Sequence, residues 1–83
     1  MTIIQTCLFT LYERYPDKKE AILSLYEKSE TFKNVCEDHW KCGEAIRFWK
    51  QKEGGVAIQR RQEYAALMRD LEEEISEYLN GLP

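Results

Sequence analysis

The chain has 83 residues, of which 43% are hydrophobic and 33% are charged, and its formal net charge is −3. This length allows one domain, spanning residues 1–83, and ten aromatic residues in a regular pattern exclude a disordered chain. The negative charge gives no overall attraction to nucleic acid or to an anionic membrane.

Residues 2–15 are predicted to form a first helix with one apolar face. That face consists of Ile4, Leu8, Leu11 and Tyr15. Thr2 is the expected N-cap. The stretch has neither a basic leader nor a small-residue cleavage site, so we expect no signal peptide and no membrane span.

A second helix is predicted at residues 17–28. Pro16 pushes the residue before it out of the helical region and suits the first turn of the helix that follows. The apolar pattern changes register near Ser29. We therefore favour a break there over one continuous helix, with Ser29 as the cap of the next helix.

The chain is organised around two longer helices, predicted at residues 30–53 and 56–79. In both, apolar positions alternate at spacings of three and four, which is the period of a coiled-coil seam. The first seam is Phe32, Val35, His39, Cys42, Ile46 and Trp49, and the second is Tyr64, Met68, Leu71, Ile75, Tyr78 and Leu82. Gly54 and Gly55 favour a turn between them, and Asn80-Gly81 with Pro83 ends the second helix.

The predicted fold is therefore all-α: an antiparallel helical hairpin with one or two shorter N-terminal helices. A hairpin covers only one side of each seam. Residues 2–28 supply further cover but leave Trp40, Phe48 and Leu67 beside the seams. We expect self-association to complete the core as a helical bundle, in a two-fold homodimer.

Charge is unevenly distributed along the hairpin. Residues 41–61 carry six basic and two acidic side chains, a net +4, whereas residues 62–83 carry a net −5. The basic side chains are Lys41, Arg47, Lys50, Lys52, Arg60 and Arg61. Trp40, Phe48 and Trp49 lie among them, so one interpretation is a tip that binds single-stranded nucleic acid. The other is a solvated tip with internal ion pairs.

Cys36, His39 and Cys42 form the pattern C-x-x-H-x-x-C. Neighbouring pairs three residues apart could share a metal ion, and a two-fold dimer could complete a zinc site. A single reactive thiol is a further interpretation, since Lys41 or His39 could lower its pKa. Packing is the favoured interpretation, because His39 and Cys42 lie on the seam and cysteine behaves as a small buried apolar residue. With Cys7 the cysteines number three and show no disulfide spacing, which indicates a reducing cytoplasm.

Several residues and short motifs of the chain resemble those of the small YdcH-type proteins of bacteria. The matching positions are Tyr15-Pro16, Ile22, Leu25, Phe32, Glu37-Asp38-His39, Ile46, Leu71 and Glu74-Ile75. The resemblance covers roughly residues 15–79 and implies a helical hairpin without implying an activity. The chain departs from that pattern in three places. Tyr15 replaces the Phe that is usual in the family, and Cys42 stands where the family tends to have Leu. Residues 64–68 replace basic residues that are common before the final segment.

No catalytic constellation is recognisable, because there is one histidine and no phosphate-binding, dinucleotide or nucleophile-elbow motif. We therefore expect a non-enzymatic interaction or assembly module with no cofactor, which binds itself or another protein. The alternatives are a nucleic-acid accessory protein using the basic tip and a metal- or thiol-dependent regulator using Cys36, His39 and Cys42.

Overall fold

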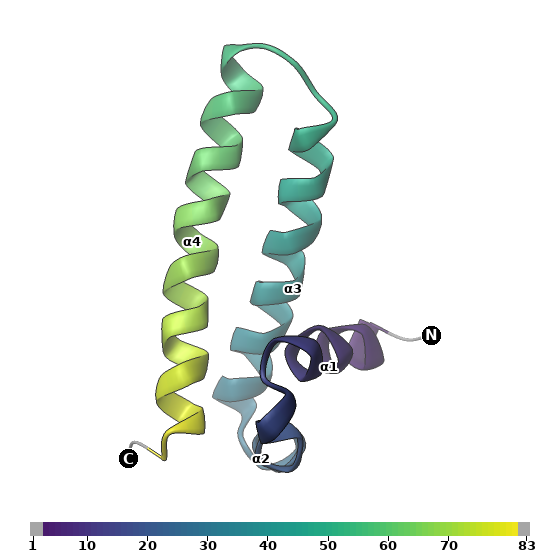
Figure 1. Ribbon diagram of the computed structural model, residues 1–83, viewed down its shortest axis with the longest axis vertical. Helices are drawn as coiled ribbons and strands as arrows, with labels where there is room; N and C mark the ends of the chain where they lie inside the picture. Colours follow the sequence, from purple (N-terminus) through teal and green to yellow (C-terminus); the bar gives the residue numbers. More distant parts are fainter. Residues whose placement is uncertain (1–2, 82–83) are drawn as a thin grey trace.

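The structure is a computed structural model that describes residues 3–81, and it is all-α (Figure 1). Its elements in chain order are α1 (Ile3–Arg14), a 3₁₀ turn η1 (Pro16–Lys18), α2 (Lys19–Lys28), α3 (Glu30–Lys50) and α4 (Gly55–Leu79). The predictions made for Thr2, Leu82 and Pro83 fall outside the described residues, and that for Ile4 falls outside the described side chains.

The first two helices are separated by an extended residue and one tight turn. Tyr15 has φ −129° and ψ 68°, because the ring of Pro16 excludes the helical conformation before it. The second helix was predicted from residue 17 but begins at Lys19. Lys18 N–H donates to the Tyr15 carbonyl at 3.0 Å, so the chain first forms a 3₁₀ turn.

The predicted break at Ser29 is confirmed. This residue is extended, with φ −119° and ψ 112°, and its hydroxyl oxygen accepts a hydrogen bond from the Phe32 N–H at 3.1 Å. The cap satisfies one of the free N–H groups at the start of α3. It also fixes the first turn of α3, where Phe32 is fully buried and packs edge-on against Tyr78 of α4, with ring centroids 5.2 Å apart.

The hairpin turn is longer than predicted. Helix α3 ends at Lys50 rather than at residue 53, and α4 begins at Gly55 rather than at residue 56. Axes of packed helices lie about 8–10 Å apart, so the chain uses residues 51–54 to cross from one helix to the other. Gly54 has φ 104°, a conformation that favours glycine. The predicted end of α4 at residue 79 is confirmed, and Gly81 follows it with φ 76°.

The core lies where α1 and α2 meet the hairpin, near its open end. Helices α1 and α2 pack mainly on α3, and α3 packs along α4 (Figure 1). The core residues are Leu11, Ile22, Tyr26, Phe32, Val35, Cys36, Cys42, Leu71 and Ile75. Met68, Tyr64 and Tyr78 of the predicted seam are half-buried against this core.

The part of the hairpin near its turn stands clear of α1 and α2 (Figure 1). Ile46 and Trp49 are only half-buried there, and Ala57 is the one buried residue among residues 43–70. Two helices alone cover only the sides that face each other, so this part of the hairpin exposes apolar side chains. Among residues 3–81, none of the helices is long and apolar enough to cross a membrane.

Candidate functional site

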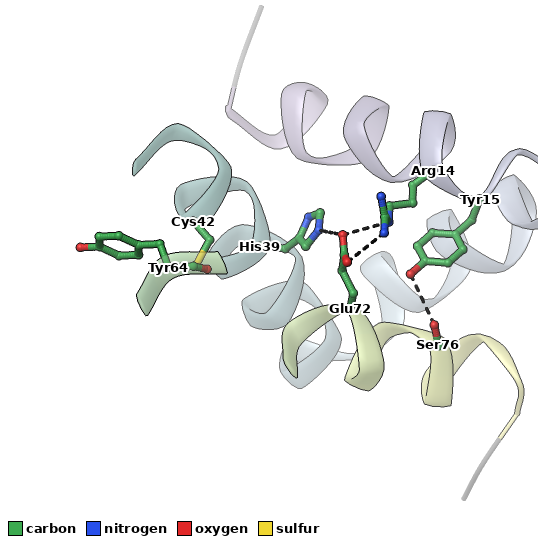
Figure 2. Close-up of polar contacts among 7 residues, drawn as sticks. All are labelled: Arg14, Tyr15, His39, Cys42, Tyr64, Glu72 and Ser76. Atoms are coloured by element: carbon green, nitrogen blue, oxygen red, sulfur yellow. Dashed lines mark hydrogen bonds and ion pairs between the residues drawn. The ribbon is translucent and has the colours of Figure 1, made fainter. Parts of the chain in front are cut away.

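A polar cluster joins α1, α3 and α4 through one carboxylate (Figure 2). Arg14 of α1 binds Glu72 of α4 with two nitrogens, Nη2 to Oε1 and Nε to Oε2, both at 2.9 Å. His39 of α3 places Nε2 3.1 Å from Glu72 Oε2. Because an ionised carboxylate only accepts hydrogen bonds, the His39 Nε2 atom carries the hydrogen. Glu72 thus holds three helices together.

The surroundings of this cluster favour a structural role. The side chain of His39 is 3% exposed, and its Nδ1 makes no hydrogen bond within the described part of the chain. A hollow of about 360 Å³ lies alongside the cluster. Its lining residues are Thr10, Glu13, Arg14, His39, Trp40, Gly43, Arg47, Met68 and Glu72. The Thr10 hydroxyl donates to the Thr6 carbonyl. Thr10, which lines the hollow, therefore donates its hydroxyl hydrogen within α1 rather than to His39.

Of this cluster, only His39 was predicted to lie on a helix seam. Neither Glu72 nor Arg14 was singled out. The spacing along α4 could have identified Glu72. It follows Met68 by four residues and precedes Ile75 by three, so it lies on the same side of the helix as these seam residues. A second contact links the residue that follows α1 to α4, with the Tyr15 hydroxyl 3.4 Å from the Ser76 hydroxyl (Figure 2).

The candidate metal ligands do not form one site. Cys36, His39 and Cys42 are all buried, and among residues 3–81 no group of three or more histidine, cysteine, aspartate or glutamate side chains is placed to hold a metal ion. His39 faces Glu72, whereas Cys42 Sγ lies 3.8 Å from the Tyr64 carbonyl (Figure 2).

The thiols also differ from the expectation of a lowered pKa. Burial raises the pKa of the Cys36 thiol from 9.0 to about 12, with further contributions from Cys7 and Glu37. Burial likewise raises the pKa of Cys42, and the nearby Asp38 carboxylate adds to it. The desolvation of a thiolate therefore outweighs any attraction to Lys41 or His39.

The basic residues of the tip are partly engaged within the molecule. Arg47 pairs with Glu44 at 2.8 Å, Arg60 pairs with Glu63 at 3.1 Å, and Arg61 donates to the Trp49 carbonyl at 3.2 Å. Lys41, Lys50 and Lys52 are exposed.

The aromatic residues of the tip offer little free surface for stacking. Trp40 and Trp49 are half-buried. Phe48 is exposed, but its ring lies edge-on against Trp49 at 5.1 Å and beneath the Lys52 ammonium group at 5.0 Å. A base would have to displace these contacts in order to stack on Phe48.

The hairpin has an uncovered side opposite the hollow near α1. A second hollow, of about 420 Å³ and with a mainly apolar lining, lies there between α3 and α4. Its lining residues are Asp38, Lys41, Cys42, Ala45, Tyr64, Leu67 and Leu71. Phe48 follows Ala45 by three residues, and Val56 precedes Leu67 by eleven, so both extend the same side toward the tip. We call this side the open face.

Apolar exposure on the open face is high. Phe48, Val56 and Leu67 are 52%, 64% and 47% exposed. The open face also carries charges on α4, because Arg60 lies seven residues before Leu67 and Glu74 lies seven after it. Phe48 and Leu67 were predicted to lie beside the seams, but the sequence pattern alone does not place them on one surface.

Comparison of the chain with protein-family models, curated proteins and solved structures finds no match. The resemblance to the YdcH-type proteins stays a prediction from the residues that carry it.

Proposed function

We propose that the chain is a non-enzymatic interaction module that binds a helical protein segment on its open face. The observation that carries this proposal is the exposure of Phe48, Val56 and Leu67 along one side of the hairpin, together with a mainly apolar hollow on that side that Leu67 lines. Contiguous apolar surface on a small protein commonly marks a place where a partner binds. A groove between two helices accepts an amphipathic helix, which inserts side chains spaced three and four residues apart.

The distribution of buried residues supports the proposal. The core is concentrated where α1 and α2 cover the hairpin, and the part near the turn is covered by neither. A helix laid along the open face would cover Ala45, Tyr64 and Leu67 and give this half of the hairpin the third layer that it lacks. Burial of apolar surface contributes about 25 cal/mol per Å².

The non-enzymatic part of the proposal is supported by how the polar groups are used. Glu72 is engaged by Arg14 and His39, which hold α1 on the hairpin. The thiols of Cys7, Cys36 and Cys42 are free but buried, which favours packing over chemistry and is compatible with the predicted cytoplasmic location.

Site-specific photo-cross-linking tests the proposal. A benzophenone amino acid replaces Leu67 in the protein expressed in the organism that encodes it, and irradiation precedes denaturing electrophoresis. We expect an adduct of one defined mass. The matched control is the same amino acid at Arg69, which is exposed on the same helix but about 200° around it from Leu67.

An adduct from position 67 and none from position 69 supports the docking role of the open face. Equal labelling from both positions, or no adduct from position 67, contradicts it. Circular dichroism of both variants establishes that the helices are retained, so that loss of the fold is not taken for loss of the partner.

A further inference from the structure

The open face has a charge pattern that is complementary to itself. Leu67 lies at its centre on α4, with Arg60 seven residues before it and Glu74 seven residues after it. At 1.5 Å per residue, each charge is about 10 Å from Leu67 along the helix axis, in opposite directions. A rotation of 180° about an axis that passes through Leu67, perpendicular to the helix, therefore exchanges the position of Arg60 with that of Glu74.

We propose that the occupant of the open face is a second copy of this chain, bound antiparallel with the two-fold axis beside Leu67. This inference rests on the proposed function and names the partner. In the dimer, Leu67 meets Leu67 of the other protomer, and Arg60 of each protomer faces Glu74 of the other. Val56 and Tyr78, each eleven residues from Leu67, also come together. The two hairpins then form a four-helix bundle.

The charge of the whole hairpin favours the same orientation. Residues 41–61 carry a net +4 and residues 62–83 a net −5. An antiparallel copy places the basic tip of each protomer beside the acidic half of the other, whereas a parallel copy places like charges together. A two-fold axis also uses the same surface on both protomers, so one face is sufficient for assembly.

Both charged side chains are available for this exchange. Arg60 is exposed and contacts Glu63 across one turn of its own helix, at 3.1 Å. Exposed pairs of this kind are weak and are readily exchanged for another carboxylate. Glu74 is exposed and makes no ion pair within residues 3–81.

Charge reversal provides the test, with absolute mass measured by light scattering after size-exclusion chromatography across a concentration series. The wild-type chain is expected at twice its 9.9 kDa mass. Arg60→Glu and Glu74→Arg each place two like-charged pairs in the dimer. Each is expected to raise the dissociation constant about tenfold.

Two combinations should restore assembly. The double variant R60E/E74R restores opposite charges at both contacts and should dimerise with itself. An equimolar mixture of the two single variants should form a heterodimer, because each single variant then meets its complement at both contacts. Arg69→Glu changes the charge of α4 by the same amount away from the open face and should leave the mass of the dimer unchanged.

A wild-type chain that stays monomeric at all concentrations overturns the inference. So does a dimer that neither single reversal weakens, or one that a single reversal weakens and R60E/E74R does not restore. The cross-linking experiment separates this failure from failure of the proposed function. An adduct of Leu67 with a heavier protein, together with a monomeric wild type, keeps the docking role and replaces the second copy as occupant.

Discussion

Glu72 accepts a hydrogen bond from the buried His39 at 3.1 Å, although the two residues are 33 positions apart and lie on different helices. The same carboxylate binds Arg14 of α1, whose side chain is 55% exposed. One side chain of α4 thus fixes α3 and α1 at once. The two contacts differ in burial, and burial decides how much each contributes to stability.

Removing Glu72 should cost more than removing Arg14. Glu72→Ala leaves both ring nitrogens of buried His39 without a partner, and we expect a loss of about 1–3 kcal/mol of unfolding free energy. Arg14→Ala removes an exposed charge and should cost at most about 1 kcal/mol. Urea unfolding followed by circular dichroism measures both. Glu73→Ala, an exposed neighbour, is the control and should stay within about 0.5 kcal/mol of wild type.

The N-cap of α3 should contribute measurably to stability. Ser29→Ala removes the hydroxyl that accepts from Phe32 N–H, and we expect a loss of about 1 kcal/mol. Ser29→Asp keeps an acceptor at the helix N-terminus and should retain most of that stability. If thermal melting shows equal losses for the two variants, the hydroxyl does not act as a cap.

The buried thiols should make the fold sensitive to alkali. Burial raises the pKa of Cys36 to about 12 and also raises the pKa values of Cys7 and Cys42 above 9.0. Since the unfolded chain loses these protons at lower pH than the folded chain, stability is fully present below about pH 9 and falls as the pH rises from 9.0 toward 12.

The slope of unfolding free energy between pH 9 and pH 11 tests this expectation. It should be shallower in Cys36→Ala than in the wild-type chain, because that variant lacks one group whose proton uptake differs between the two states. Identical slopes would show that Cys36 does not contribute. In the folded protein at neutral pH, alkylation of all three thiols should be slow compared with a free cysteine peptide.

Two neighbouring leucines should respond differently to a charge. Leu71 is buried, so Leu71→Glu places an unpaired charge in the core and should unfold the chain at a cost of several kcal/mol. Leu67 is exposed, so Leu67→Glu should keep the helical circular-dichroism signal and lower only the mass measured by light scattering. A folded, dimeric Leu67→Glu variant would contradict the place of this residue at the interface.

The basic tip should bind nucleic acid weakly or not at all, because four of its six basic side chains contact partners within the molecule. Fluorescence anisotropy with a labelled single-stranded RNA is the measurement. Binding in 50 mM salt that disappears in 200 mM salt, and that Lys50→Glu/Lys52→Glu abolishes, would reverse this conclusion in favour of an electrostatic nucleic-acid site.

Local chemistry determined most of the secondary structure from the sequence alone. Pro16 ended the first helix, the hydroxyl of Ser29 capped the third, and Gly54 and Gly81 took positive φ values at the ends of α4. These effects act within one turn of the chain, so a short stretch of sequence contains them. The predicted bounds were wrong at residues 15, 17, 53 and 56, because the residues that connect one helix to the next do not show in the apolar periodicity.

Only the tertiary structure decided which carboxylate turns inward and which side of the hairpin stays open. Glu72, Glu73 and Glu74 are adjacent and chemically alike, and the register of α4 against α3 brings the first of them to His39. In the same way, the seam pattern does not state on which side of the hairpin α1 lies. The packing of α1 near Glu72 leaves Leu67 exposed on the other side of the hairpin. The apolar pattern of one helix does not determine which of these two sides α1 covers.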